Sequence, residues 1–417
     1  MSNNIKAYQI EASVEPLNGT INLPASKSIC NRVLIIRELC DRPFTIHNLS
    51  DSDDTRVLDA VFHSDDPVFD VGHAGTAMRF LAAYLSRITG EWILTGSDRM
   101  KQRPIQVLVD ALRQLGANIE YIENEGYPPL KICGSHLKGG IVELDGSVSS
   151  QYISALLMIA PALEGGLTLK LKNRVASRSY IELTLKLMTK FGIRHSWKNN
   201  EIRVPEQTYL PVDYTVESDW SAASYWYQLL TLVPSGEIKL KNLHISGLQG
   251  DEVVSHWFTG FGIETKKTGN GIKIHKIDYA QPLRIFLNFH ENPDIAQTMA
   301  VLCVAKGIPF HFTGLDTLKI KETNRVDALQ NELAKFGALL TEPQEGELKW
   351  DGIIHSDLAE EKPVIETYND HRMAMAFAPL ALLGKPLIIN NPQVVTKSYP
   401  NFWNDLKNVG FRISEAE

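Results

Sequence analysis

One pattern recurs five times along the 417-residue chain: an amphipathic helix, a glycine between apolar neighbours, and then a strand. The first copy is "LVDALRQLGANIEY" and the last is "FWNDLKNVGFRIS". Each glycine stands where a helix would end in a left-handed residue, a conformation that glycine adopts without steric cost. These glycines are Gly116, Gly192, Gly262, Gly337 and Gly410, so successive copies lie 70 to 76 residues apart.

The near-constant spacing predicts an α/β protein built from about six repeated units of about 70 residues. The segment "TRVLDAVFHSDDPVFDV" resembles the copy that has lost its glycine. Two short stretches, "LPASK" near Pro24 and "VESDW" near Asp219, are suited to act as hinges. We therefore predict a discontinuous domain of residues 1–25 and 218–417, with a second domain, residues 26–217, inserted into it.

Composition excludes several classes of protein. A hydrophobic content of 44% with 22% charged residues is ordinary for a soluble globular chain, and the net charge of -7 argues against nucleic acid or an anionic membrane as the main partner. The N-terminus lacks a signal-peptide pattern, and the run "MAMAFAPLALL" is too short to span a bilayer, so we expect a cytoplasmic protein. The four cysteines form no CxxC pair, which favours reduced thiols over disulfides or zinc.

Three segments place small polar residues or glycine directly before an apolar helical run: "ASKSICNRVLIIREL", "GHAGTAMRFLAAYL" and "SSQYISALLMIAPAL". The free backbone N–H groups at such helix starts bind phosphate or carboxylate. Ser26, Ser28, Ser149 and Ser150 are also ordinary N-cap residues, and each motif alone favours that interpretation. The three motifs together favour anion binding.

Basic residues accompany these helix starts and other junctions of small and apolar residues. A lone Lys or Arg is usually a solvated surface charge, but eight at such junctions predict a cleft for a polyanionic ligand. No GxxxxGK[ST] or GxGxxG loop indicates a nucleotide. The eight are Lys27, Arg32, Arg79, Arg103, Lys321, Arg325, Arg372 and Lys397.

The segment "LKIKETNRVDAL", residues 318–329, predicts a helix whose opening carries Lys319, Lys321, Glu322 and Arg325. Helix starts favour acidic residues, because the macrodipole is positive there. Lys321 and Arg325 are therefore unfavourable at this helix start. We therefore expect these charges to face inward, toward a ligand.

The motifs "SKSICNR", "AGTAMR", "RP" after "MKQ", "SSQY", "NPD", "KETNR", "NDHRMAM" and "TKSYP" occur in one fixed order. With them the chain resembles, nearly end to end, the EPSP synthase family of 3-phosphoshikimate 1-carboxyvinyltransferases. The resemblance implies an enolpyruvyl transferase fold of six β-α units, three per domain, with the active site in the interdomain cleft. It also implies a monomer, small-molecule substrates, and a reaction without metal or cofactor: the enolpyruvyl group of phosphoenolpyruvate passes to the 5-hydroxyl of shikimate 3-phosphate.

The resemblance also implies roles for individual residues. Contacts to shikimate 3-phosphate are expected from Lys27, Ser28, Arg32, Ser149, Ser150, Gln151, Ser177, Tyr180, Asp294, Thr317 and Lys321. Contacts to phosphoenolpyruvate are expected from Lys27, Gly75, Arg103, Gln151, Lys321, Arg325, Arg372 and Lys397. Asp294 would be the base for the attacking hydroxyl and Glu322 the proton donor, work that Lys27 can share. From "NPD" alone, Asp294 would be a helix N-cap, and Glu322 would be an exposed partner of Lys321 or Arg325.

The chain departs from the family's usual residues at three positions, His73, Phe80 and Thr317, where Asn, Pro and Asn are usual. Three alternatives stay open. The sister transferase that acts on UDP-N-acetylglucosamine carries a loop cysteine before Arg-Pro, which "SDRMKQRP" lacks. RNA 3′-phosphate cyclases need a nucleic-acid surface, and a non-catalytic relative would bind phosphorylated metabolites without needing both Asp294 and Glu322.

Overall fold

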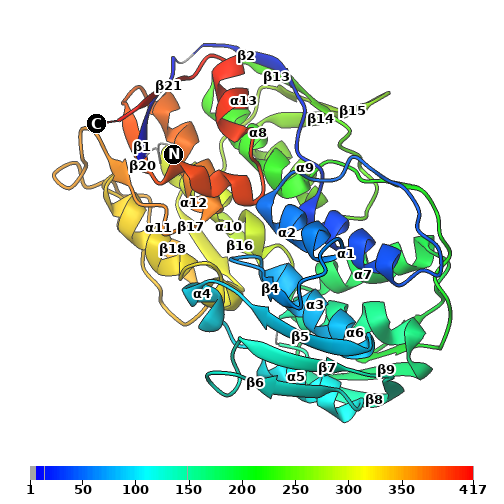
Figure 1. The fold of residues 1–417 in the computed structure, drawn as a ribbon. Coiled ribbons are helices and arrows are strands. Elements are labelled where there is room, and N and C mark those ends of the chain that lie inside the picture. The colour runs from blue at the N-terminus through cyan, green and yellow to red at the C-terminus, as the bar shows by residue number, and fades with distance from the viewer. Residues whose placement is uncertain (1–5, 14, 148, 417) are drawn as a thin grey trace. The chain divides into compact units, whose positions relative to one another are not determined.

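The computed structural model describes residues 6–13, 15–147 and 149–416 (Figure 1). The chain divides into two compact units: unit 1 comprises Met1–Pro24 with Glu217–Glu417, and unit 2 comprises Ala25–Val216. Among the described residues, no helix has the length and apolar character needed to cross a membrane.

Three sheets with the strand orders β19-β20-β1-β21, β14-β15-β13-β2 and β16-β17-β18 form the β structure of unit 1 as far as it is described. Their strands are β1 (Ala7–Glu11), β2 (Leu17–Ile21), β13 (Gly236–Lys241), β14 (Ile263–Thr268), β15 (Gly271–Lys276), β16 (Ile285–Asn288), β17 (Phe310–Thr313), β18 (Leu348–Trp350), β19 (Val364–Ile365), β20 (Leu387–Asn390) and β21 (Arg412–Glu415). The α-helices are α8 (Trp220–Leu232), α9 (Val254–Trp257), α10 (Ala296–Ala305), α11 (Arg325–Ala334), α12 (His371–Phe377) and α13 (Phe402–Asn408). Three 3-10 helices matter below: η4 (Pro293–Ile295), η5 (Asp316–Ile320) and η7 (Pro392–Lys397).

In unit 2 the described strands form sheets with the orders β4-β5-β7-β6, β10-β11-β9-β8 and β12-β3. These strands are β3 (Ile46–His47), β4 (Val68–Asp70), β5 (Gly90–Thr95), β6 (Asn118–Tyr121), β7 (Leu130–Gly134), β8 (Lys138–Asp145), β9 (Glu164–Lys172), β10 (Ser196–Lys198), β11 (Glu201–Val204) and β12 (Tyr214–Thr215). The α-helices are α1 (Lys27–Glu38), α2 (Asp53–Val61), α3 (Gly75–Arg87), α4 (Asp98–Lys101), α5 (Gln106–Gln114), α6 (Ser150–Ile159) and α7 (Arg178–Lys190).

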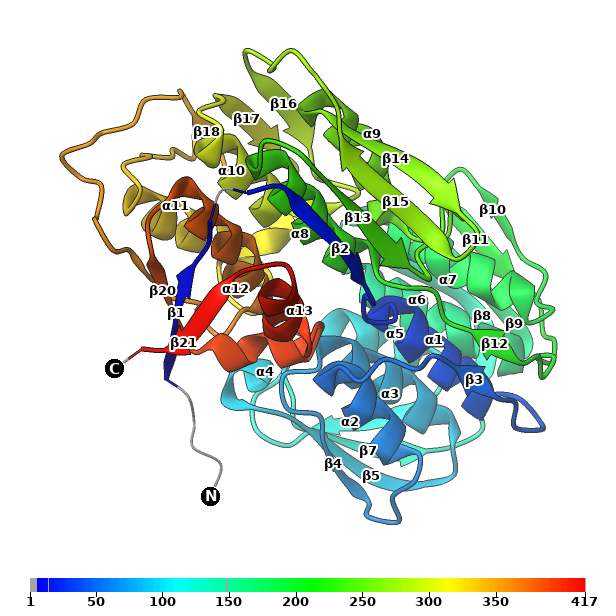
Figure 2. The same cartoon turned by 90° about the horizontal axis from the view of Figure 1, so that it is seen from above.

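Each unit keeps its most apolar helices inside. In unit 1, α10 packs against α8, α11 and α12, and all seven residues of α12 are buried. The sheet β14-β15-β13-β2 packs on α8, as Figure 2 shows. In unit 2, α1, α3, α6 and α7 pack on one another. The packed faces of these helices are apolar, so both units hold their helix starts against a packed core.

The predicted glycines all adopt the left-handed conformation, with φ between 77° and 102°. Strands follow four of them, but the strand predicted after Gly337 is wrong: within the described chain that segment makes only the isolated bridges Ala338–Ile354 and Thr341–Lys349. Pro343 and the left-handed Gly346 end this pairing, because neither favours a continuous ladder. The count of six repeats stays a prediction.

Candidate active site

Six charged side chains of unit 1 are joined by ion pairs and form what we call the unit 1 cluster. They are Asp294, Glu322, Arg325, Asp370, Arg372 and Lys397.

Short helical elements place these side chains. Asp294 lies on η4, directly before the buried helix α10, and Arg325 is the first residue of α11. Arg372 is the second residue of α12, and Lys397 is the last residue of η7. Glu322 lies in the irregular segment between η5 and α11. Four of the five are therefore at or next to the start or end of a helix, where small backbone changes would redirect them.

Arg325 is the centre of the cluster, with only 1% of its surface exposed. Its Nη1 donates to Asp294 Oδ1 at 3.0 Å and its Nη2 donates to Glu322 Oε2 at 3.1 Å. Its Nε donates to Asp370 Oδ2 at 2.7 Å. Burial lowers the pKa of Arg325, but the carboxylates of Asp370, Glu322 and Asp294 outweigh burial and raise that pKa above its ordinary value. The guanidinium is therefore held charged by three anions.

The two candidate catalytic acids are each held between two cations. Asp294 Oδ2 lies 2.8 Å from Arg372 Nη2, in addition to the contact with Arg325. Glu322 Oε1 lies 2.6 Å from Lys397 Nζ, also in addition to Arg325. Both acids are therefore paired inside the protein, and the interpretation of Glu322 as an exposed surface partner is wrong.

Asp294 is ionised at neutral pH. Burial raises the pKa of its carboxyl group, but the charges of Arg372, Lys321 and Arg325 lower that pKa further, to well below the ordinary value. The N-cap interpretation of Asp294 is wrong, because Ile295 occupies the N-cap position of α10 and no side chain caps that helix. A deprotonated carboxylate is the state that a general base requires.

Asp370 was missed by the sequence reasoning. Its carboxylate accepts from Nε and Nη2 of Arg325 and also from the backbone N–H of Arg372, at 2.9 Å, as the N-cap of α12. One buried side chain thus fixes both arginines of the cluster. An aspartate directly before an apolar helical run is a recognised N-cap signal, and "NDHRMAMAF" contains it.

The charged helix start predicted for residues 318–329 is wrong in its position. Residues 316–320 form η5, Lys321 is extended, and α11 begins only at Arg325. The Asn324 side chain accepts from the backbone N–H groups of Val326 and Asp327, and this cap sets the start of the helix. Thr317 lies on η5 and Lys321 directly follows it, so neither is part of α11.

Asp251 is a second acid that the sequence reasoning missed. Its carboxylate accepts from the Ser221 hydroxyl and, at 3.1 Å, from Asn292 Nδ2, next to η4. Only 5% of Asp251 is exposed. Burial, and then the charge of Asp294, raises the pKa of Asp251 to about 6. Ionisation of this group therefore works against the folded state.

We expect Asp251→Asn to stabilise the protein at pH 7 but not at pH 4. Because the folded-state pKa is raised, the contribution of Asp251 is fully present below its unfolded pKa of about 3.9 and is lost as pH rises through about 6. The loss is on the order of 3 kcal/mol. Urea unfolding of both proteins from pH 4 to 7 measures it, and a stability difference that does not vary with pH would contradict this assignment.

In unit 2 the predicted helix starts lie at the beginnings of α1, α3 and α6. Lys27 is the first residue of α1, and its Nζ lies 3.3 Å from Asp54 Oδ2. Ser149 caps α6 by accepting from the backbone N–H of Gln151. Ser26 occupies the N-cap position of α1 but its hydroxyl makes no cap bond, and Ser28 and Ser150 lie within their helices, so Ser149 alone of the four serines caps a helix with its side chain.

Gly75 is the first residue of α3, and Arg103 lies directly against it. A Cβ at position 75 would lie 2.7 Å from Arg103 Nη1, so a larger residue there would displace the guanidinium from this helix start. Arg79 is only 3% exposed, and it donates to the backbone oxygen of Pro104 at 3.0 Å. Arg79 was predicted to be a cation of the anion-binding cleft. Its guanidinium instead bonds to the backbone of the loop that carries Arg103.

The remaining predicted residues of unit 2 lie around α6, α7 and the loop before α3. Gln151 Nε2 donates to Thr76 Oγ1 at 3.2 Å, and His73 Nδ1 lies 2.9 Å from the Ser97 hydroxyl. Ser177 is the left-handed N-cap residue of α7, with φ of 50°, and Tyr180 lies in the first turn of that helix. The Tyr180 backbone oxygen accepts from Arg32 Nη2 at 3.3 Å.

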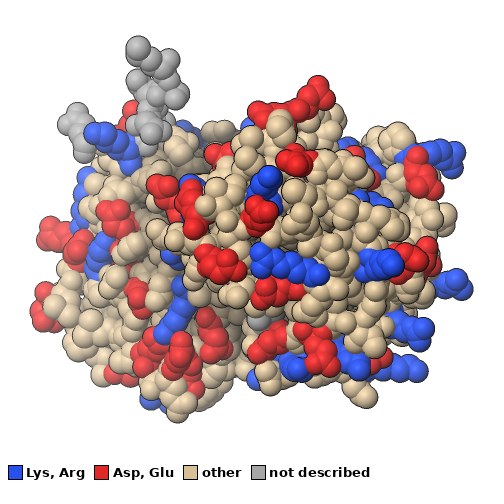
Figure 3. Space-filling view, turned by 60° about the horizontal axis from the view of Figure 1, so that its bottom comes forward, with Lys and Arg blue, Asp and Glu red and all other residues tan. Residues whose placement is uncertain are grey.

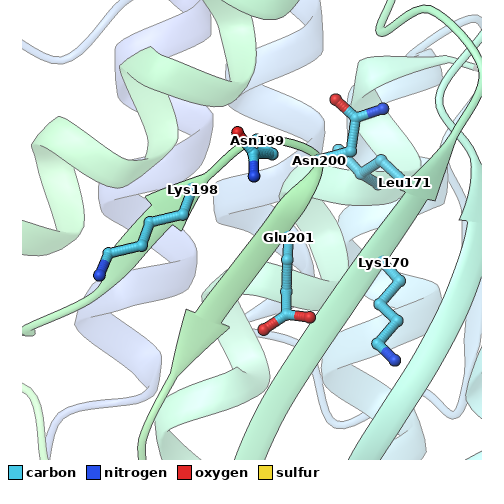
Figure 4. A pocket seen from close by; sticks show the side chains of 6 residues that line it. All are labelled: Lys170, Leu171, Lys198, Asn199, Asn200 and Glu201. Atoms are coloured by element: carbon cyan, nitrogen blue, oxygen red, sulfur yellow. The ribbon is translucent and has the colours of Figure 1, made fainter.

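One surface pocket of unit 2 contains none of the predicted residues. It lies at the β10–β11 turn and the neighbouring strand β9 (Figure 4), and five of its six lining residues are exposed. Lys170 and Glu201 face each other across the pairing of β9 and β11. The lining residues are Lys170, Leu171, Lys198, Asn199, Asn200 and Glu201. This pocket at a turn has both acidic and basic lining residues and contains none of the predicted anion-binding residues, so it is not the candidate active site.

Comparison with known proteins bears on the whole chain. A family model described as EPSP synthase (3-phosphoshikimate 1-carboxyvinyltransferase) matches residues 60–406. A 3-phosphoshikimate 1-carboxyvinyltransferase of Bacteroides fragilis is 50% identical over 404 residues, covering 96% of this chain and 97% of that protein. One from Vibrio atlanticus is 38% identical over 425 residues, covering 94% and 97%.

The fold has a counterpart among solved structures. An EPSP synthase structure from Acinetobacter baumannii superposes with a TM-score of 0.78 and covers 98% of this chain and 100% of that one. The two sequences are only 19% identical, so this likeness concerns the fold. It confirms the predicted α/β architecture.

Proposed function

Since the chain belongs to the EPSP synthase (3-phosphoshikimate 1-carboxyvinyltransferase) family, we infer that it transfers the enolpyruvyl group of phosphoenolpyruvate to the 5-hydroxyl of shikimate 3-phosphate. The products are 5-enolpyruvylshikimate 3-phosphate and phosphate, formed by addition and elimination through a tetrahedral intermediate. The observation that carries this inference within the molecule is the unit 1 cluster, in which the two candidate catalytic carboxylates and Asp370 stand among three cations.

Asp294 is proposed as the general base and Glu322 as the proton donor. Addition needs removal of a proton from the attacking hydroxyl and delivery of a proton to the methylene carbon. The low pKa of Asp294 keeps its carboxylate deprotonated, as a base must be, although it also lowers the affinity of that carboxylate for a proton. Both oxygens of Glu322 accept hydrogen bonds, from Arg325 and Lys397, so Glu322 must take up a proton before it can donate one, and Lys27 of unit 2 is a second candidate for the donor.

The cations of the cluster are proposed to bind substrate anions. Each substrate has one carboxylate and one phosphate group, and guanidinium groups bind such oxyanions through paired hydrogen bonds. Arg325, Arg372 and Lys397 are each paired with an acid of the protein itself. Phosphoenolpyruvate must therefore compete with Asp294 and Glu322 for these cations, and its binding releases Asp294 to act as a base.

We assign the remaining contacts as the family resemblance implies. Shikimate 3-phosphate is assigned Lys27, Ser28, Arg32, Ser149, Ser150, Gln151, Ser177, Tyr180, Asp294, Thr317 and Lys321. Phosphoenolpyruvate is assigned Lys27, Gly75, Arg103, Gln151, Lys321, Arg325, Arg372 and Lys397. We propose that the two units are the two domains of the transferase, and that it works as a cytoplasmic monomer without metal or cofactor.

The alternatives from the sequence have less support. The matching family model and the relatives described above are 3-phosphoshikimate 1-carboxyvinyltransferases, not transferases acting on UDP-N-acetylglucosamine. The face drawn in Figure 3 mixes basic and acidic side chains, whereas a nucleic-acid surface gathers basic ones.

Release of inorganic phosphate tests the proposed function. We expect release when shikimate 3-phosphate and phosphoenolpyruvate are both present, and none when either is omitted. UDP-N-acetylglucosamine in place of shikimate 3-phosphate is expected to give no release. Phosphate release with that acceptor, or from phosphoenolpyruvate alone, would reject the assignment.

A further inference from the structure

Arg32, on α1 of unit 2, is a buried cation with neutral partners. Only 2% of it is exposed. Its Nε donates to Thr184 Oγ1 at 2.7 Å and its Nη1 to the Ser28 backbone oxygen at 2.8 Å. Its Nη2 donates to Ser154 Oγ at 3.2 Å and to the Tyr180 backbone oxygen at 3.3 Å. Within residues 6–13, 15–147 and 149–416, no carboxylate forms an ion pair with it.

This arrangement is the opposite of that around Arg325. Removing a charge from water without a counter-ion is unfavourable, and Arg325 is compensated by three carboxylates. Burial lowers the pKa of Arg32 to about 10, so the guanidinium is still charged at neutral pH. Its charge is therefore not neutralised inside unit 2, and an anion that reaches it meets no competing carboxylate.

The hydrogen bonds also leave one donor of Arg32 unused. A guanidinium has five N–H groups, and the four bonds account for Nε–H, one Nη1–H and both Nη2–H groups. The second Nη1–H makes no hydrogen bond to the described residues. A single donor on a fixed, charged plane suits one oxygen of a carboxylate or phosphate.

Phe80, on α3, supports the plane of the guanidinium from one side. Arg32 Cζ lies 5.3 Å from the centre of the Phe80 ring, within the range of a cation–π interaction. Phe80 is itself buried.

We propose that Thr184, Ser154 and Phe80 are positioning residues that hold Arg32 for an oxyanion of shikimate 3-phosphate. Thr184 lies on α7, Ser154 on α6 and Phe80 on α3, so three buried helices fix one guanidinium. The two hydroxyls are also hydrogen-bonded to each other, at 2.8 Å, which restricts both. The proposal rests on the proposed function and adds residues that do not themselves contact the substrate.

The test compares Thr184→Val, which removes the hydroxyl at nearly constant volume, with Thr184→Ser, which keeps it. Losing a hydrogen bond to a charged group costs about 1.5 to 3 kcal/mol. We expect Thr184→Val to raise both KM and Kd for shikimate 3-phosphate by about 10-fold or more, with kcat and the KM for phosphoenolpyruvate nearly unchanged. Thr184→Ser should restore both values. Phe80→Leu is expected to raise the same two constants by up to about 30-fold, because a buried cation–π contact is worth about 2 kcal/mol.

Thr189→Val is the matched control, since Thr189 lies on the same helix and bonds to the Leu185 backbone oxygen, away from Arg32. It should change neither constant. Equal changes in KM for both substrates, or no rescue by Thr184→Ser, would overturn the proposal. Should Thr184→Val not fold, Ser154→Ala serves in its place with the same expectations. Absence of turnover in the unmodified protein would instead count against the proposed function. Calorimetric binding of shikimate 3-phosphate would still test the role of Thr184, because it does not depend on turnover.

Discussion

Asp294→Ala is expected to lower kcat by about 10²- to 10⁴-fold, the range that a general base contributes, while the Kd for shikimate 3-phosphate changes by less than about 3-fold. The base acts on one hydroxyl of this substrate, whereas its binding depends on phosphate and carboxylate contacts. Steady-state turnover and calorimetry measure the two quantities separately. Asp357→Ala, at an exposed acid of the same unit, is the control and should leave both unchanged.

The ion pairs of Asp294 also predict how Asp294→Ala binds phosphoenolpyruvate, and this distinguishes a catalytic base from a residue that only contacts substrate. Asp294 is ion-paired with Arg325 and Arg372, so its removal takes one carboxylate away from each of these cations, while Arg325 keeps Glu322 and Asp370. Phosphoenolpyruvate should therefore bind to Asp294→Ala more tightly than to the unmodified protein, although turnover is lost. Unchanged turnover would remove Asp294 from the catalytic role. Weaker binding of phosphoenolpyruvate would show that Asp294 does not compete with this substrate.

Features that depend on neighbouring residues were predictable from the sequence. The left-handed glycines and the three helix starts follow from local steric and capping preferences, and the structure confirms both. The exact start of α11 was not predicted, because the sequence reasoning followed the charges and overlooked the cap residue Asn324. A short side chain with one acceptor oxygen decided that boundary.

The pairing of the charges could not be read from the sequence. Arg325 meets Asp294 across 31 positions and Asp370 across 45, and these distances in sequence are set by how α10, α11 and α12 pack. The same holds for Arg32, whose neutral partner Thr184 lies 152 positions away. The family motifs predicted which residues would bind anions. They did not indicate that the arginine of unit 2 lacks a counter-ion while that of unit 1 has three.

Arg325→Met is expected to lower the free energy of unfolding by about 3 to 5 kcal/mol and to prevent phosphoenolpyruvate binding at ordinary concentrations. The change leaves three carboxylates without their shared cation, and Asp370 among them has no exposed surface. Arg325→Lys, which keeps the charge but not the planar fork, should lose less stability and still bind phosphoenolpyruvate poorly.

A second replacement and a change of pH identify the cause of that loss. Adding Asp370→Asn to Arg325→Met should recover part of the stability, because one uncompensated buried charge is removed with the cation. Because the pKa of Asp294 is lowered in the folded protein, its ionised form contributes stability above about pH 4, and this stability is lost as the pH falls through the folded-state pKa. The stability difference between Arg325→Met and the unmodified protein should therefore become smaller in acid. Urea midpoints of the four proteins at pH 7 and at lower pH measure both effects. Two results together would contradict this explanation: a double variant no more stable than Arg325→Met, and a stability difference between Arg325→Met and the unmodified protein that does not shrink in acid. Arg325 would then stabilise unit 1 by the packing of its side chain and not by balancing the three carboxylates.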